Sequence, residues 1–171
     1  MATSHAHGRA EPKNAHKAQS VSGTLSRAED LCLKGGVKLT ESRRRILEIL
    51  ATEGRPLGAY DLIEKVAATS SKRPAPISIY RALDFLLENG LIHRLASRNA
   101  YLACGHGHAV QEPVVFLICD KCGEVAEATS RELSRSLLQL ADRAKFAPRV
   151  QVMEVAGFCQ ACTAAAEPHQ P

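Results

Sequence analysis

The sequence lacks the features that would send the chain to or through a membrane. It has no apolar run long enough to span a bilayer, and its first residues contain no apolar stretch of the kind that a signal peptide needs. It also shows no internal repeat. We therefore expect a cytoplasmic protein with no membrane partner, whose thiols stay reduced.

With 171 residues, the chain has room for one domain or two small ones. Neither half would bury much apolar surface alone, so we expect a metal ion or a dimer partner to supply part of the stability. From Leu25 to Tyr101 there are thirteen Lys and Arg against nine Asp and Glu, whereas from Cys104 onward there are six against eight. A basic first half favours nucleic acid and an acidic second half favours ions, although a chance fluctuation explains the charges equally well.

Two Cys-x-x-Cys pairs stand in the C-terminal part of the chain: Cys119 with Cys122, and Cys159 with Cys162. Four thiolates are the ligand set of a structural zinc site, and two intervening residues allow both sulfurs of a pair to reach one ion. The alternatives are two disulfides, which need an oxidising compartment, or a redox dithiol, which more often occurs as a single pair. The spacing favours zinc, as a clamp that closes a small domain.

Apolar periodicity in the first half predicts helices followed by a hairpin. The hairpin strands flank Arg98 and Asn99, and Pro76 opens the last helix. The predicted helices cover residues 25–34, 41–52, 59–69 and 76–88, and the strands cover residues 91–97 and 100–104. Helices followed by a two-stranded hairpin describe a winged helix, which is a DNA-binding fold.

The last of these helices has the features of a recognition helix. Ser78, Tyr80 and Arg81 lie in or near its first turn, away from the apolar face, and the preceding loop carries Lys72 and Arg73. Residues at the start of a recognition helix contact base edges and phosphates in the major groove. An ordinary solvated helix face is the alternative, because an Arg in a first turn is common.

The second half predicts a small α/β domain with one helix and several strands. Thr129 and Glu132 are predicted to form a capping box at the start of the helix. The predicted strands cover residues 113–119, 124–129 and 149–159, and the helix covers residues 130–146. The fold class is therefore α+β, with a disordered tail over residues 1–23, a winged-helix domain over 24–103, a zinc-binding domain over 104–163 and a second tail over 164–171.

A second group of metal-binding residues lies near the domain boundary. Cys104, His106 and His108 follow the hairpin, His93 lies on its other strand, and Glu127 follows the first cysteine pair. A mixed set of sulfur, nitrogen and oxygen ligands suits zinc and is more exchangeable than four thiolates. Such a site would join both domains, which is the chemistry of a sensor. Each residue taken singly also fits a structural role: a histidine on a wing, a buried cysteine or a surface carboxylate.

Several segments carry a resemblance to a known family. They read "YDLI", "ISIYRALDFLLENGLIHRL", "YLAC", "VFLICDKCGEVAE" and "GFCQAC". In these segments the chain resembles the ferric uptake regulator superfamily, specifically its zinc uptake regulator branch. The resemblance implies a homodimeric, zinc-responsive bacterial repressor that controls zinc uptake genes and is not an enzyme. It would bind double-stranded DNA at a dyad-symmetric operator and dimerise through its C-terminal domain.

The resemblance also assigns residues to two zinc sites per protomer. By position, Cys119, Cys122, Cys159 and Cys162 match the structural site, His93, Cys104 and Glu127 match the regulatory site, and Tyr80 and Arg81 match positions that read DNA. The family usually has a further regulatory histidine just before the strand that begins at residue 113, where this chain has Gln111 and Glu112. We expect His108 to fill that role, with His106 and Glu112 as substitutes.

Other functions remain open at this point. Within the superfamily, an iron, manganese or peroxide sensor would lean on histidine and carboxylate ligands, whereas Cys104 favours zinc. A zinc hydrolase using His93 and Cys104 would need an open coordination position, which four protein ligands do not leave. A winged-helix scaffold that binds metal only at the four cysteines is the third alternative.

Overall fold

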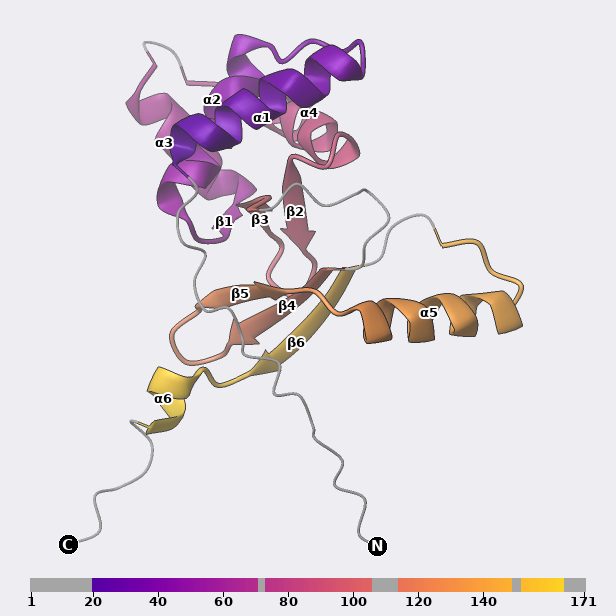
Figure 1. Cartoon of the computed structure of the whole chain (residues 1–171). Coiled ribbons are helices and arrows are strands. Elements are labelled where there is room, and N and C mark those ends of the chain that lie inside the picture. Colours follow the sequence, from indigo (N-terminus) through magenta and orange to yellow (C-terminus); the bar gives the residue numbers. More distant parts are fainter. Residues whose placement is uncertain (1–19, 71–72, 106–113, 149–151, 165–171) are drawn as a thin grey trace, which may run out of the picture.

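The computed structural model describes residues 20–70, 73–105, 114–148 and 152–164. A group of helices lies at one end of the molecule, a second sheet lies below it, and the hairpin of β2 and β3 stands between them (Figure 1). The fold is α+β, with a winged helix followed by a smaller sheet domain, as the sequence predicted. In the described part of the chain, no helix combines the length and apolar character that a membrane crossing requires.

Four helices form the first part of the fold. They are α1 (Val21–Lys34), α2 (Glu41–Glu53), α3 (Ala59–Ala68) and α4 (Pro76–Glu88). Their apolar faces meet in one core that contains Leu47, Leu50, Leu62, Leu83 and Leu86, all fully buried.

A glycine marks the end of α2, and a proline marks the start of α4. Gly54 ends α2 in the left-handed conformation, with φ of +61°, and Pro76 occupies the first turn of α4. Helix α1 begins at Val21, earlier than the apolar pattern indicated. The Ser20 hydroxyl caps it by accepting a hydrogen bond from the Gly23 N–H at 3.2 Å, a polar signal that the periodicity of apolar residues does not register.

A small antiparallel sheet completes the winged helix. Strands β2 (Ile92–Leu95) and β3 (Ala100–Ala103) form the predicted hairpin, and β1 (Leu57–Gly58) pairs with the other edge of β3. The strand β1 was not predicted, since two residues are too short to show a pattern. Asn99 takes the positive φ of 46° that the turn between β2 and β3 needs. This turn is the tip of the wing.

The second sheet has the order β5-β4-β6. Strand β4 (Val114–Cys119) lies in the centre, antiparallel to β5 (Val125–Ala128) and parallel to β6 (Val152–Gly157). The crossover between β5 and β6 contains α5 (Arg131–Arg143), and the short helix α6 (Gln160–Ala164) follows β6.

Helix α5 projects away from both sheets and has no buried residue (Figure 1). Its cap is Ser130, whose hydroxyl accepts from the Leu133 N–H at 3.3 Å, so the predicted capping box at Thr129 was placed one residue too early. The helix is amphipathic in sequence, yet within one chain its apolar stripe faces solvent. That stripe is available to a partner.

The wing packs on the second sheet. Leu95 and Leu102 of the hairpin join Val114, Phe116 and Ile118 of β4 in a second apolar core. The two parts of the molecule therefore share buried side chains, and the orientation of the wing is coupled to that of the second sheet.

Candidate metal centre and nucleic-acid interface

The four cysteines of the two Cys-x-x-Cys pairs come together at one end of the second sheet. The sulfurs of Cys119, Cys122, Cys159 and Cys162 all lie within 4.8 Å of one another. The Sγ atoms of Cys122 and Cys159 are 3.7 Å apart. Zinc–sulfur bonds of about 2.3 Å in a tetrahedron place the sulfurs about 3.8 Å apart. The cluster therefore has the dimensions of a four-thiolate zinc site, and all six cysteines of the chain are free thiols rather than disulfides.

Strand register brings the two pairs together across a long stretch of sequence. Cys119 ends β4 and pairs with Gly157 at the end of the parallel strand β6, so Cys159 emerges beside it. A tight turn follows Cys119, in which Gly123 has φ of +76° and donates its N–H to the Cys119 carbonyl at 3.0 Å. Helix α6 then carries Cys162 back toward the other sulfurs.

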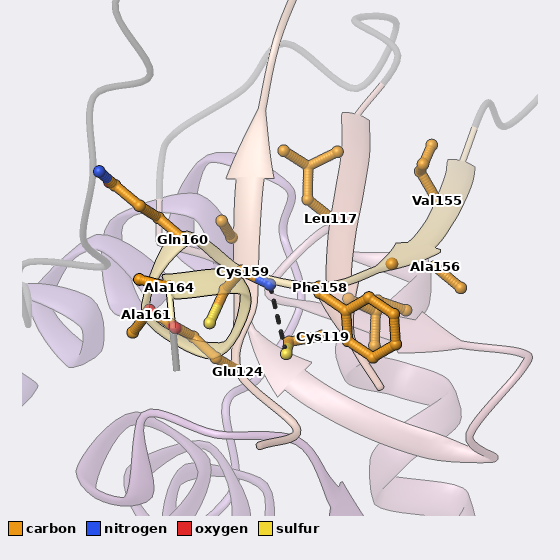
Figure 2. A pocket seen from close by; sticks show the side chains of 13 residues that line it. Leu117, Cys119, Glu124, Val155, Ala156, Phe158, Cys159, Gln160, Ala161 and Ala164 are labelled. Atoms are coloured by element: carbon orange, nitrogen blue, oxygen red, sulfur yellow. Dashed lines mark hydrogen bonds between the residues drawn. The ribbon is translucent and has the colours of Figure 1, made fainter. Parts of the chain in front are cut away.

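Backbone amides surround the sulfur of Cys119. The N–H groups of Cys122 and then Cys159 lower the pKa of Cys119 to about 6, so this residue is a thiolate at neutral pH. Figure 2 shows the contact from the Cys159 nitrogen, which lies 3.4 Å from the Cys119 sulfur. Burial, followed by the neighbouring sulfurs of Cys122 and Cys159, raises the pKa of Cys162 to about 12. Four thiolates this close can all ionise only around a cation, which fits zinc.

An apolar hollow lies beside the cysteine cluster, between β4, β6 and α6 (Figure 2). Leu117, Val155 and Phe158 line it, and all three are exposed large apolar side chains. An exposed apolar surface of this kind is typical of an interaction site.

The described residues that were predicted for the second metal site lie on or beside strands near the junction of the two parts. In the β2–β3 register His93 pairs with Leu102, so Cys104, two residues further along, lies on the same face as His93. The His93 ring meets the Phe116 ring edge-on, with centroids 5.2 Å apart. Phe116 pairs with Glu127 across β4 and β5, which places Glu127 on that same side. The Cys104 side chain is buried.

The remaining predicted ligands of this second site, His106, His108 and Glu112, lie outside the described residues. Sequence reasoning missed one neighbour of the site. The Arg27 guanidinium of α1 donates a hydrogen bond to the carbonyl oxygen of Cys104. No sequence pattern could have found this contact, because the two residues are far apart along the chain.

The predicted DNA-reading residues lie on the outer face of α4. Ser78, Tyr80 and Arg81 are exposed, whereas Ile79 between them is buried in the helical core. Arg73, beside the start of this helix, is exposed and forms an ion pair with Glu64, and Lys72 lies outside the described residues. The helix thus exposes the Tyr80 ring and the Arg81 guanidinium, while Ile79 anchors it in the core.

Two exposed apolar residues, one on α3 and one on α4, were not singled out from the sequence. Tyr60 in the first turn of α3 is 78% exposed and Ile77 in the first turn of α4 is 58% exposed. Their signal was available, because both fall off the apolar face of their helices.

A winged helix joined to a sheet with a four-cysteine centre defines a metal-binding protein of the DNA-binding class. The model of the ferric uptake regulator family matches residues 34–156. The chain belongs to the ferric uptake regulator family.

Individual relatives point to one branch of this family. The zinc uptake regulation protein of Escherichia coli K12 is 35% identical over 141 residues, which cover 81% of this chain and 80% of that protein. A structure of a zinc uptake regulator in complex with zinc and DNA superposes with a TM-score of 0.79 at 32% identity, covering 86% of this chain and 97% of the other.

The relative XcZur has been solved in two states. The holo structure superposes with a TM-score of 0.76 at 38% identity, over 85% of this chain and 99% of the other. The apo structure reaches a TM-score of only 0.50 at 37% identity, over 84% of this chain and 97% of the other. At nearly equal identity, the arrangement of this chain therefore matches the holo structure more closely.

Proposed function

We propose that this chain is a zinc-responsive, DNA-binding transcriptional repressor that acts in the cytoplasm as a homodimer and controls genes for zinc uptake. The observation that carries the proposal is the arrangement of the chain, which resembles that of a regulator bound to zinc and DNA and differs from that of an apo relative. The four-thiolate centre and the exposed face of α4 support it from within the molecule. On this proposal the chain has no enzymatic role.

In this function the two metal sites have different tasks. Zinc at Cys119, Cys122, Cys159 and Cys162 would be structural, because four thiolates close the coordination shell and tie the end of β4 to the segment that follows β6. The regulatory site would use His93, Cys104 and Glu127, with His108 as the fourth ligand and His106 or Glu112 as its substitutes. The mixed donors would release zinc more readily, so the occupancy of this site would follow the free zinc concentration.

The regulatory site would act by fixing the two parts of the chain against each other. His93 and Cys104 belong to the wing, whereas Glu127 belongs to β5 of the second sheet. A ligand that binds one arrangement more tightly than another shifts the population toward it. Zinc at this site would favour the arrangement in which a dimer presents two α4 helices to successive major grooves of a dyad-symmetric operator.

The dimer would form through the C-terminal part. Leu138 and Leu140 of α5 are 50% and 64% exposed, and Phe158 after β6 is 68% exposed. Exposed apolar residues that lie on one part of a small protein mark an interaction site. A second copy of this chain would supply a matching apolar surface by symmetry.

The test measures binding to an operator duplex by fluorescence anisotropy at buffered free zinc concentrations. His93→Ala and Cys104→Ser should need higher free zinc for half-maximal binding, because each removes one of four ligands, while both proteins keep structural zinc and the dimer. The same assay with His106→Ala, His108→Ala and Glu112→Gln identifies the fourth ligand. Buffered iron and manganese in place of zinc test the alternative sensors.

Two controls separate the regulatory effect from others. Cys32→Ser removes a buried thiol of α1 that lies outside both metal sites and should leave the zinc dependence unchanged. Arg81→Ala should weaken binding by about 1–3 kcal/mol at every zinc concentration, since it removes a base contact rather than a metal ligand. If His93→Ala and Cys104→Ser both follow the wild-type zinc curve, the mixed site is not the sensor.

A further inference from the structure

The tip of the wing is held by one carboxylate of the second sheet. Glu154 in β6 accepts hydrogen bonds from the Ala96 N–H at 2.6 Å, from the Ser97 N–H at 3.1 Å, and from the Ser97 hydroxyl. Ala96 and Ser97 begin the turn that joins β2 to β3. Fifty-eight residues separate Ala96 from Glu154 along the chain, so this contact depends entirely on the tertiary fold.

The position of Glu154 follows from strand pairing. In the parallel register of β4 and β6 it stands beside Phe116, which is fully buried and contacts the His93 ring of the wing. The side chain therefore points to the face on which the wing packs. Glu154 is the acidic residue of β6, and its neighbours Met153 and Val155 point to the other face of the sheet.

The carboxylate is charged in this position. Burial raises the pKa of Glu154, but the hydrogen bonds from Ser97 and Ala96 outweigh that effect and leave the pKa below its ordinary value. Hydrogen bonds to an ionised acceptor are roughly twice as strong as those between neutral groups. Three such hydrogen bonds join Glu154 to the turn between β2 and β3. Because the residues of a tight turn move together, these bonds restrain the whole turn.

A second contact lies at the same turn. The Arg98 guanidinium donates to the carbonyl oxygen of Cys119 at 3.2 Å and lies 3.4 Å from the Asp120 carboxylate. Cys119 belongs to the four-cysteine cluster, so the tip of the wing contacts both β6 and the loop that carries the metal centre. Together with the shared apolar core, these contacts allow the wing few orientations relative to the second sheet.

We propose that Glu154 is a positioning residue for DNA binding, whose carboxylate caps the Ala96–Ser97 turn and fixes the orientation of α4 relative to the metal-binding sheet. The inference rests on the proposed function, because it states that Glu154 holds the orientation of α4 in which the dimer binds its operator. Two α4 helices in a dimer must meet half-sites separated by one helical turn of DNA, about 34–36 Å, or a multiple of it. An orientation that fluctuates lowers the fraction of dimers competent to bind, and the apparent affinity falls by that fraction.

The experiment compares the full-length zinc-loaded dimers of wild type, Glu154→Ala, Glu154→Gln and the control Glu124→Gln. Glu124 lies just before β5 in the same sheet domain, is exposed, and makes no side-chain hydrogen bond or ion pair within the described part of the chain. The control therefore removes the same charge without touching the wing. Three quantities are measured: amide hydrogen exchange in the wing turn, operator affinity at saturating zinc, and zinc content with oligomeric state.

Glu154→Ala should accelerate exchange at Ala96 and Ser97 and weaken operator binding about tenfold, because a smaller fraction of dimers has the binding orientation. Glu154→Gln should show the same changes to a smaller degree, since its amide oxygen still accepts hydrogen bonds without the charge. The control should match the wild type in all three measurements, and zinc content and dimer should be unchanged in every variant.

Two results would overturn the inference. Wild-type exchange in the turn of Glu154→Ala would show that the carboxylate does not hold it, and wild-type operator affinity would show that holding it does not matter. Loss of zinc or of the dimer in Glu154→Gln would also overturn it, because the residue would then be structural. If wild type itself shows no zinc-dependent operator binding, the proposed function fails, while the exchange measurement still decides whether Glu154 holds the wing.

Discussion

Among the residues that the structure describes, the helical part of the molecule has a core of eighteen buried side chains, whereas the core beside the second sheet has five, of which Leu95 and Leu102 come from the wing. The helical part also contains the residues that end its helices, such as the Ser20 cap of α1 and Gly54 at the end of α2. The sheet domain leaves α5 without a buried residue and much of β6 exposed. Apolar burial is the main driving force of folding, so the helical part can be stable by itself. The sheet domain needs what the chain alone does not provide, namely a metal ion and a partner.

Removing one thiolate of the four-cysteine cluster should affect the sheet domain far more than the helical part. Cys122→Ser leaves an incomplete shell, so the protein should lose much of the roughly 10–16 kcal/mol that zinc binding contributes to folding of a four-ligand site. The sheet domain and the dimer should be lost while α1 to α4 remain folded. Hydrogen exchange resolved along the chain, with zinc supplied, separates the two parts.

The conservative control for this change is Cys32→Ser, since Cys32 is a buried thiol of the helical core. It should weaken the helical part only and leave the zinc content intact. Equal protection of β4 and β6 in Cys122→Ser and wild type would show that the four thiolates do not hold the sheet domain together.

The second change tests the helical core. Leu83→Ala removes a fully buried side chain of α4 and should cost about 2–5 kcal/mol of stability, through lost burial and the cavity that remains. The sheet domain should keep its zinc, which is the reverse of the result for Cys122→Ser. Thermal melting followed together with zinc content measures both effects.

Leu33→Ala is the matched control, because Leu33 is 79% exposed at the end of α1. Its effect on stability should stay within about 0.5 kcal/mol. A Leu83→Ala protein that releases zinc as it melts, at the same temperature, would mean that the two parts unfold as one unit.

The third change should have the smallest effect on the fold of a single chain. Leu140→Glu places a charge on the exposed apolar stripe of α5, where it should alter monomer stability by no more than about 0.5 kcal/mol. It should nevertheless weaken the dimer, because a buried unpaired charge in an interface is strongly unfavourable. Sedimentation equilibrium over a range of protein concentrations measures the dissociation constant.

Arg143→Glu, a change of charge at the last residue of the same helix, serves as a comparison for Leu140→Glu. If Leu140→Glu dimerises as tightly as wild type, the apolar stripe of α5 is not the dimer surface, and the cover for this helix must come from elsewhere.

Local patterns in the sequence were enough to predict most elements. Pro76 and the apolar positions after it defined α4, and Asn99 marked the turn of the hairpin. The errors occurred where a single polar group or two residues decided the structure. Ser20 starts α1 before its apolar face begins, Ser130 rather than Thr129 caps α5, and β1 is too short to show a period.

The four-cysteine centre was predictable because its ligands occur in pairs whose spacing is a local property. The mixed site could be predicted only in part. Strand register places His93 and Cys104 on one face of the hairpin and Glu127 beside Phe116, but their role as ligands and the identity of the fourth ligand remain predictions. The contacts of Arg27 with Cys104 and of Arg98 with Cys119 had no sequence signal at all.

The sequence by itself therefore determined the helices α1 to α5, the hairpin and the pairs of thiols, because each depends on residues that are neighbours along the chain. The short helix α6 was not predicted. Only the tertiary structure decided which carboxylate holds the wing and which helix is left uncovered. Glu154 meets Ala96 because a parallel strand pairing and a shared apolar core bring them together across fifty-eight residues. Amphipathic periodicity predicts that α5 has an apolar face, but it cannot tell whether the same chain or a second copy covers that face.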